Sequence, residues 1–427
     1  MLATISIILI ALFVLSVPIA VSMGLAGFSA ILIRGDIPIE VTAQRIVTGV
    51  DSFPLLAVPF FILAGALMNT GGVTERLVRL ANAMVGHLTG GLGHVVVVTN
   101  MIMAGMSGSA VADAAGTGSV LIPAMTRAGF EPSFAAAVTA SASTIGPIIP
   151  PSIPFVLYGV LASVSIGRLF LGGAIPGVLM GLYLMAVVYF VSKKRGYAKG
   201  ERATCGSLWL AFRDGIPALM LPVLILWGII GGVVTPTEAA VLAVLYALFL
   251  GVFVYKEMTL PRLYQVLGEA ALTAGTIMFI VGCANLLAWI LTREQAGPLL
   301  VKSVTSITTD PKMVLLVINI ILLIMGCFLE TLSIMILLVP VLMPLVKALG
   351  IDPVHFGVVF TLNLMIGLIT PPVGMSMFIS CTIAKIKITQ FAKEIPLFIG
   401  ALVLVLLAIT YFPELVLFLP NLIMGKG

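Results

Sequence analysis

Long apolar stretches recur along the chain and are separated by short polar ones. Apolar runs of roughly 18 residues or more are typical of membrane-spanning helices. Uninterrupted spans are predicted at about 54–74, 169–191, 215–234, 236–255, 266–292 and 395–419. Residues 1–33 are apolar too, and Pro18 favours two short spans over one, whereas the charged residues of 34–52 predict a loop or interfacial segment.

One interrupted apolar segment occurs twice. Residues 121–154 read LIPAMTRAGFEPSFAAAVTASASTIGPIIPPSIP, and a shift of 221 positions aligns them without a gap to 342–375. The Pro and Gly positions in register are Pro123, Gly129, Pro132, Gly146, Pro150 and Pro151, which recur as Pro344, Gly350, Pro353, Gly367, Pro371 and Pro372. Because Gly and Pro fix backbone geometry, the shared feature is a helix that is broken in the same way in both halves. Broken helices are predicted at about 133–163 and 354–384.

Two further apolar segments have polar centres. The first, about 94–125, contains the small and polar run from Gly105 to Gly116, and the second, about 312–348, contains Glu330 and Ser333. Such centres predict re-entrant hairpins, because irregular backbone at membrane depth survives only where protein or a cavity surrounds it. Gly326 lies 221 residues after Gly105, so the repeat includes the hairpins.

Charge and repeat together predict the domain organisation. The first repeat is 1–192, a cytoplasmic loop is 193–214, and the second repeat is 215–427. With the loop in the cytoplasm, fourteen of the twenty-two Lys and Arg fall on that side, as membrane orientation requires. The two hairpins then enter from opposite faces. The predicted fold is an all-α polytopic membrane protein built as an inverted repeat with two re-entrant hairpins and two broken helices.

Composition supports this class and excludes others. The chain is 60% hydrophobic and 9% charged, whereas soluble domains are about 25% charged. The ten-residue alternating segments of a β-barrel are absent, and the net charge of +5 reflects loop residues rather than a nucleic-acid surface. The four cysteines have no metal-ligand spacing, and the chain contains neither a Walker A sequence nor HExxH. We predict no catalytic residue, no enzyme activity and no organic cofactor.

The polar tips and breaks are predicted to converge near the membrane midplane. Unwound backbone and neutral hydroxyl or amide oxygens suit a small hard cation, and half-helix N-termini attract a carboxylate. The predicted Na⁺-binding residues are Ser107, Ser109, Thr144, Gly146 and Pro150 in the first half and Glu330, Thr331, Asn363, Gly367, Thr370 and Pro371 in the second. The predicted substrate-binding residues are Asp113, Ser143, Ser152, Ser333 and Gly374. The alternative is that Gly and Ser only permit close helix packing.

Two carboxylates lie at the predicted tips. Placing the charged side chains of Asp113 and Glu330 inside a membrane costs free energy, and both residues are functional candidates for that reason. Each is either a cation ligand or proton carrier, or a cap on the N-terminus of a half-helix. Glu238, in VVTPTEAAV, is predicted to cap the helix that starts after Thr235 and Pro236.

The segments MSGSAVADAAG, GPIIPPSIPFVLYG with the later AIPG, and GLITPPVGMSMF resemble the large membrane subunit of tripartite ATP-independent periplasmic (TRAP) transporters, as does DSFPLLAVPFFILAGALMNTGGVTERL. The resemblance covers nearly the whole chain. It implies a sodium-driven importer in the bacterial inner membrane with an elevator mechanism. A periplasmic binding protein would deliver an organic acid, and a separate four-span subunit would be bound alongside. Glu330 stands where the family more often has Asp.

The motifs identify the substrate less specifically than they identify the family. The segment GHLTGGLGHV is most similar to the sialic-acid-importing branch, with C4-dicarboxylate import close behind. Three alternatives remain: a proton-coupled or stand-alone carboxylate or ion transporter, a channel of similar architecture, and an intramembrane enzyme. A channel needs a continuous polar pore and an enzyme needs a paired nucleophile and base, whereas polarity here is concentrated at two tips and two breaks.

Overall fold

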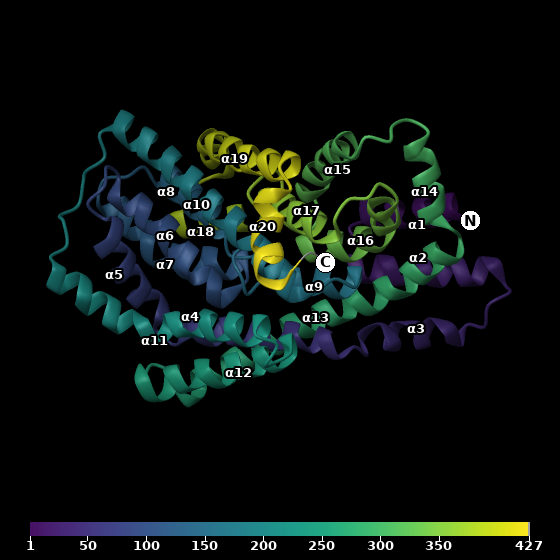
Figure 1. Ribbon diagram of the computed structural model, residues 1–427, viewed down its shortest axis with the longest axis horizontal. Coiled ribbons are helices and arrows are strands. Elements are labelled where there is room, and N and C mark those ends of the chain that lie inside the picture. Colours follow the sequence, from purple (N-terminus) through teal and green to yellow (C-terminus); the bar gives the residue numbers. More distant parts are fainter. Residues whose placement is uncertain (426–427) are drawn as a thin grey trace.

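The computed structural model describes residues 1–425, and within them the chain forms α-helices with two short distorted helical segments and no strand. Seven helices within residues 1–425 are long and apolar enough to cross a membrane. Figure 1 shows two layers of helices. These features make the chain an all-helical, multi-pass membrane protein, as predicted.

One layer contains the helices that precede the hairpin in each half. It comprises α1 (Leu2–Val14), α2 (Ile19–Arg34), α3 (Glu40–Val50), η1 (Phe53–Leu56), α4 (Ala57–Thr70), α11 (Cys205–Ile230), α12 (Pro236–Phe249), the π-helical η2 (Leu250–Val254) and α13 (Leu260–Arg293). The long α13 packs against α2, α3 and α4, and α12 packs against α4. We call this layer the scaffold layer; its helices α3, α4, α11, α12 and α13 lie along the lower edge of Figure 1.

The other layer contains the hairpins and broken helices, and we call it the core layer. It comprises α6 (Gly91–Ser107), α7 (Ala110–Arg127), α8 (Pro132–Ser143), α9 (Ile153–Ala162), α10 (Ile166–Arg195), α15 (Pro311–Gly326), α16 (Thr331–Ala348), α17 (Pro353–Gly367), α18 (Met375–Ala384), α19 (Ile388–Tyr411) and α20 (Glu414–Met424). Two amphipathic helices, α5 (Val73–Val85) and α14 (Ala296–Thr305), connect the layers. The chain therefore changes layer through α5 and α14 at equivalent points of the two halves.

The hairpins and breaks form where Gly and Pro interrupt the apolar pattern. Hairpin 1 is α6 and α7, hairpin 2 is α15 and α16, and the broken helices are α8–α9 and α17–α18. Each break contains a cis Pro-Pro bond, Pro150–Pro151 in break 1 and Pro371–Pro372 in break 2. Each broken helix begins at a proline, whose missing N–H is not needed in the first turn.

The segments that follow the two hairpins lie at opposite ends of α19. Arg195 ion-pairs with Glu131, which follows hairpin 1, and with Glu394 near the start of α19. His355, which follows hairpin 2, instead bonds the carbonyl oxygen of Ile409 near the end of α19 at 2.7 Å. Since α19 is one continuous helix, the hairpins enter the core layer from opposite sides, and the repeat is inverted.

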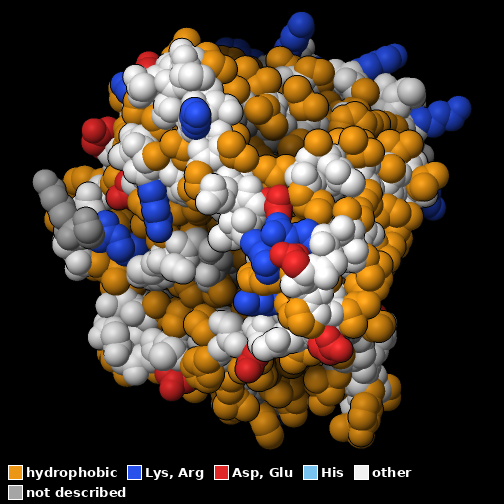
Figure 2. All heavy atoms as spheres, turned by 90° about the vertical axis from the view of Figure 1, so that its right-hand side faces the viewer, with side chains coloured by type: hydrophobic (Ala, Val, Ile, Leu, Met, Phe, Trp, Pro, Cys, Tyr) orange, Lys and Arg blue, Asp and Glu red, His pale blue; other side chains and the backbone are white. Residues whose placement is uncertain are grey.

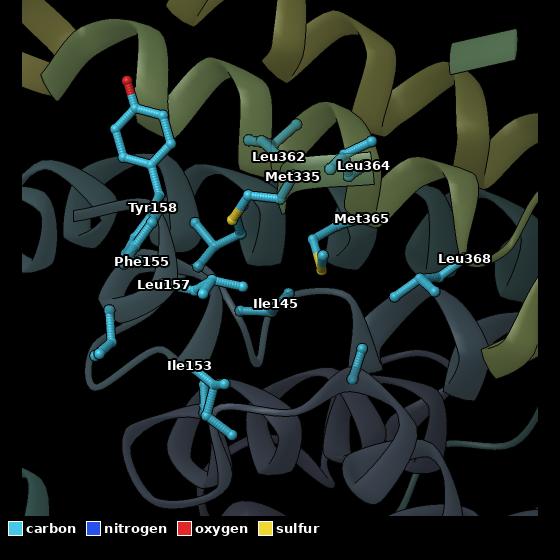
Figure 3. Packing of buried hydrophobic residues seen from close by; sticks show 14 of the residues in the cluster. Ile145, Ile153, Phe155, Leu157, Tyr158, Met335, Leu362, Leu364, Met365 and Leu368 are labelled. Atoms are coloured by element: carbon cyan, nitrogen blue, oxygen red, sulfur yellow. The ribbon is translucent and has the colours of Figure 1, made fainter. Parts of the chain in front are cut away.

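The core between the two halves is built by the broken helices. In Figure 3, Ile145 of break 1 and Leu157 of α9 point toward Met335 of α16 and Met365 of α17, and Phe155 lies beside Tyr158 on α9. All of these side chains are buried. Tyr158, also on α9, donates a 2.7 Å hydrogen bond to the carbonyl of Pro353 at the start of α17. The two breaks are therefore held in one apolar core.

Several boundaries differ from the sequence-based expectation. The connection predicted at 193–214 is helix-free only at 196–204. Basic residues stabilise the last turn of a helix, so α10 continues to Arg195. Thr204 caps α11 by accepting from the Ser207 amide, so that helix begins early. The last span, expected at 395–419, is instead α19 and α20, separated at Phe412 and Pro413. The polar segment 34–52 contains α3, and α14 was not predicted at all.

Two local predictions are confirmed. Residues 1–33 form two short helices, with Pro18 directly before α2. Thr235 and Glu238 form a capping box at the start of α12, so Glu238 is a helix cap.

Charged side chains meet at one end of the scaffold layer. Arg34 ion-pairs with Asp36 and Glu294, and its hydrogen bond lowers the pKa of the Asp36 carboxyl below its usual value. Figure 2 shows this end of the molecule, where hydrophobic side chains surround a central cluster of basic and acidic side chains.

Candidate functional site

The first candidate centre is the contact between the tip of hairpin 1 and break 1. The chain turns at Gly108, where φ is +58°, a conformation that glycine adopts without strain. A β-carbon at Gly108 would lie 3.0 Å from the carbonyl oxygen of Pro151 and 3.2 Å from the amide nitrogen of Ile153. The tip and the break therefore meet backbone to backbone, with no side chain between them.

Asp113 lies at the heart of this centre. Its side chain is completely buried in the first turn of α7, and within residues 1–425 neither carboxylate oxygen has a hydrogen-bond partner. Gly146 of break 1 faces it so closely that a β-carbon there would overlap Oδ2. Ser109, not Asp113, caps α7 by accepting from the amide of Ala112. The capping alternative therefore does not hold for Asp113, and an unpaired buried carboxylate is left that requires a cation or a proton.

Most hydroxyl groups predicted at this centre donate to nearby backbone. Thr144 donates to the carbonyl of Ser141 at 2.6 Å and Ser143 to that of Ala140 at 2.8 Å. Ser152 donates to Pro147 and caps α9 by accepting from the amide of Phe155 at 3.2 Å. A donating hydroxyl keeps acceptor capacity, so Thr144 and Ser143 still present oxygen lone pairs. Ser152 is a buried cap, a role the sequence-based prediction of a substrate contact did not foresee.

Two more elements complete the first centre. Ser107 accepts from the amide of Ser109 at 3.4 Å, so both predicted serines lie at the tip. A β-carbon at Gly105 would lie 3.7 Å from the carbonyl oxygen of Pro150, which places that carbonyl beside α6. The structure thus places Ser107, Ser109, Gly146 and Pro150 at the contact between the tip and break 1, with Asp113 against Gly146.

The second candidate centre is the contact between hairpin 2 and break 2. Here Gly326 and Gly367 touch, because a β-carbon on Gly367 would lie 2.7 Å from both the α-carbon and the carbonyl oxygen of Gly326. The amide of Val373 also donates to the carbonyl of Cys327 at 3.2 Å. Break 2 is therefore joined to the tip of hairpin 2 by main-chain contacts, as break 1 is to hairpin 1.

Glu330 behaves differently from Asp113. Its carboxylate accepts from the amide of Ser333 at 3.1 Å and from the Ser333 hydroxyl at 3.0 Å, so it is the N-cap of α16. Of the two alternatives for this residue, the structure shows the cap. Ser333 is correspondingly held by Glu330, and Thr331 is buried in the first turn of the same helix.

Break 2 also gathers backbone oxygens. A β-carbon at Gly374 would lie 2.8 Å from the carbonyl oxygen of Leu368 and 3.1 Å from that of Thr370. The Thr370 hydroxyl donates to the carbonyl of Ile366 at 2.7 Å. Pro371 belongs to the cis Pro371–Pro372 pair, between Thr370 and Gly374 in the chain. Converging carbonyls at an interrupted helix are the ligands that such breaks offer to a small cation.

Asn363 belongs to a network that the sequence analysis missed. Its amide donates to the backbone and side-chain oxygens of Asn319 at 2.9 and 3.0 Å, and Asn319 donates to Thr410 at 3.0 Å. This buried chain joins hairpin 2, the broken helix and α19. Asn319 lies in an otherwise apolar run, PKMVLLVINIILLIMG, and a polar residue there is a signal in its own right. In hairpin 1, Asn100 and Thr117 join the two arms in the same manner.

Two broken helices and two hairpins in an inverted repeat, with polar groups at each interruption, define a membrane transporter of the secondary type. The chain belongs to the DctM component family of the tripartite ATP-independent periplasmic transporters, whose family model matches residues 6–415. Its homologues are transporter permeases and not enzymes.

Among its relatives, the sialic acid TRAP transporter large permease protein SiaM of Vibrio cholerae is 42% identical over 96% of both chains. The isethionate TRAP transporter permease protein DctMQ of Oleidesulfovibrio alaskensis is 44% identical over 95% of this chain, which spans 64% of that longer protein. The C4-dicarboxylate TRAP transporter large permease protein DctM of Pseudomonas aeruginosa is 39% identical over 94% of both.

Solved structures share the fold at low sequence identity. The YdaH transporter of Alcanivorax borkumensis superimposes with a TM-score of 0.63 at 14% identity and 88% coverage of each chain. MtrF of Neisseria gonorrhoeae superimposes with a TM-score of 0.60 at 15% identity, over 86% of this chain and 83% of its own.

Proposed function

We propose that this chain is the translocation subunit of a sodium-driven importer of a small organic acid in the bacterial inner membrane. The observation that carries the proposal is the buried, unpaired carboxylate of Asp113 against Gly146. A cation bound there by Asp113, the hydroxyls of Ser107 and Thr144 and the carbonyl of Pro150 would compensate the charge. The sodium gradient would supply the driving force, and these four residues would supply the oxygen ligands and exclude water from the cation.

The substrate class is inferred from the relatives. Their names specify sialic acid, isethionate, 2,3-diketo-L-gulonate and C4-dicarboxylates, all of them small organic anions. Sialic acid and C4-dicarboxylates are our first two candidates. An anion lying beside breaks 1 and 2 would meet the N-termini of α9 and α18, whose dipoles favour a carboxylate.

An elevator movement of the core layer is the mechanism we infer. Each hairpin is fastened to its broken helix by backbone contacts, which favours the core layer moving as one body. The scaffold layer has its own packing, and amphipathic α5 and α14 connect the two. By family, the binding protein would deliver substrate and the small four-span subunit would enlarge the scaffold.

Reconstituted uptake tests the proposal. Proteoliposomes containing this chain and the small subunit, supplied with binding protein and N-acetylneuraminate or succinate, are expected to accumulate substrate only under an inward sodium gradient. Omission of either partner should reduce uptake to background. Accumulation driven by a proton gradient without sodium would assign Asp113 as a proton carrier, and uptake by this chain alone would contradict the tripartite assignment.

The orientation is a separate prediction. Basic residues at 193–202 favour a cytoplasmic location for the connection at 196–204. On a cysteine-free background, a cysteine at exposed Arg202 should react with a membrane-impermeant maleimide only after the membrane is opened. Labelling from the periplasmic side in intact cells would reverse the assigned topology.

A further inference from the structure

A surface pocket of about 320 Å³ lies between α5, α11 and the end of η2, away from both candidate centres. It is lined by Arg76, Arg79, Arg213, Asp214, Pro217, Val254 and Tyr255. Three arginines from two helices converge here, although charged residues are only 9% of the chain. Such a concentration in a membrane protein requires a physical reason.

The arginines are not neutralised by their protein neighbours. Arg76 is fixed by Glu257 at 2.8 Å and lies 4.0 Å from the centre of the Tyr255 ring. Arg79 is exposed and has no ion pair within the described part of the chain, and Arg213 reaches only Asp214, at 3.8 Å. Three positive charges thus face two negative ones, which leaves the pocket with a net positive charge.

The pocket is rigid on its protein side. Leu80 of α5 packs at Gly215 of α11, where a β-carbon would lie 3.4 Å from Leu80. Tyr255 donates to the carbonyl of Asp214 at 3.4 Å, and Tyr246 of α12 donates to that of Pro217 at 2.7 Å. Arg79 and Arg213 are therefore presented by helices that hold a constant spacing.

Apolar surface continues from the same helices. On α11, Trp209 and Phe212 are 63% and 42% exposed and pack together, and Phe249 and Phe253 do the same at the end of α12 and in η2, at 51% and 67% exposure. Exposed aromatic residues beside basic ones are typical of the membrane interface. A ligand that fits both surfaces has an anionic head and acyl chains.

We propose that this pocket binds the phosphate headgroup of an anionic phospholipid. Arg79 and Arg213 would contact the phosphate, because guanidinium groups bind phosphate oxygens in pairs, and the acyl chains would lie along the exposed aromatic residues of α11 and α12. Arg76 and Arg79 belong to α5, which connects scaffold helix α4 to hairpin 1. A bound lipid would therefore fasten this connecting helix to α11.

Native mass spectrometry of the full-length protein in detergent tests the site directly, with dioleoyl phosphatidylglycerol and dioleoyl phosphatidylcholine as probes. We expect one phosphatidylglycerol to bind in preference to phosphatidylcholine. The double variant Arg79→Gln/Arg213→Gln should lose about 25-fold in affinity, from the loss of two interfacial arginines. Arg79→Lys/Arg213→Lys keeps the charge and should retain most of the binding.

The matched control is Lys194→Gln/Arg202→Gln, which removes the same charge from exposed positions outside the pocket and should bind lipid as the unmodified protein does. Unchanged phosphatidylglycerol binding in the Arg79→Gln/Arg213→Gln variant would overturn the proposal. Displacement of the lipid by millimolar inorganic phosphate would overturn it as well, because it would assign the pocket to a free anion. Binding is read without transport, so the result is independent of the proposed function.

Discussion

Replacing Asp113 by asparagine is expected to weaken sodium-driven uptake strongly while the protein still folds. The carboxylate is buried without a partner beside Gly146, so its charge is tolerated only with a bound cation or a proton. Removing one member of a buried charge pair costs about 3–5 kcal/mol. The sodium concentration for half-maximal uptake should therefore rise by at least about a hundredfold.

Thermal unfolding in detergent separates this effect from misfolding. Sodium should raise the Tm of the unmodified protein, because a ligand that binds only the folded state stabilises it. Asp113→Asn should lose that response, and without sodium it should be at least as stable as the unmodified protein, since no charge remains to be buried. Asp310→Asn is the matched control: Asp310 caps α15 at an exposed position, and asparagine caps as well. An unchanged sodium response in Asp113→Asn would place the cation elsewhere.

Replacing Gly367 by alanine is expected to separate hairpin 2 from break 2. The new methyl group would lie 2.7–2.8 Å from three backbone atoms of Gly326, and backbone cannot rotate away as a side chain can. Overpacking of this kind costs about 1–3 kcal/mol. We expect a lower Tm together with a loss of uptake, because the tip and the break form one of the two candidate centres.

Gly400→Ala provides the comparison for this variant. Gly400 lies in α19 of the same layer, and a β-carbon there would meet no atom within 4 Å. Alanine is favoured over glycine in a helix by about 1 kcal/mol, so this variant should be as stable as the unmodified protein or more so. If Gly367→Ala kept the Tm and uptake of the unmodified protein, hairpin 2 and break 2 would not form a functional unit.

The Asn319, Asn363 and Thr410 network gives a physical reason for treating hairpin 2 as part of a larger body. Buried amides that lose a partner in an apolar surrounding are costly, so opening hairpin 2 away from α17 would break bonds that water cannot replace there. Hairpin 1 has its own internal bonds through Asn100 and Thr117. We therefore propose that hairpin 2 moves with its broken helix rather than opening separately.

Local chemistry explains why much of the fold is readable from the sequence. A Pro-Pro pair interrupts a helix, so Pro150–Pro151 and Pro371–Pro372, with their 221-residue spacing, predict both broken helices from the sequence. The cap at Glu238 depends on residues three positions apart and was predictable for the same reason. Helix ends such as those of α10, α11 and α19 were less predictable, because flanking charges and caps extend or divide a helix beyond its apolar core.

Tertiary structure alone decided the roles of the polar residues. Asp113 and Glu330 are both carboxylates at hairpin tips, yet Glu330 stands at the cap position and bonds its own helix, whereas Ser109 takes that position before Asp113 and leaves the aspartate facing Gly146. Asn363, predicted as a cation ligand, donates its amide to Asn319, 44 residues away, and its side-chain oxygen has no hydrogen-bond partner within the described residues. Sequence determines where a backbone must break, because that is a local property of Gly and Pro. It does not determine which buried polar group remains without a partner, because the partners come from other helices.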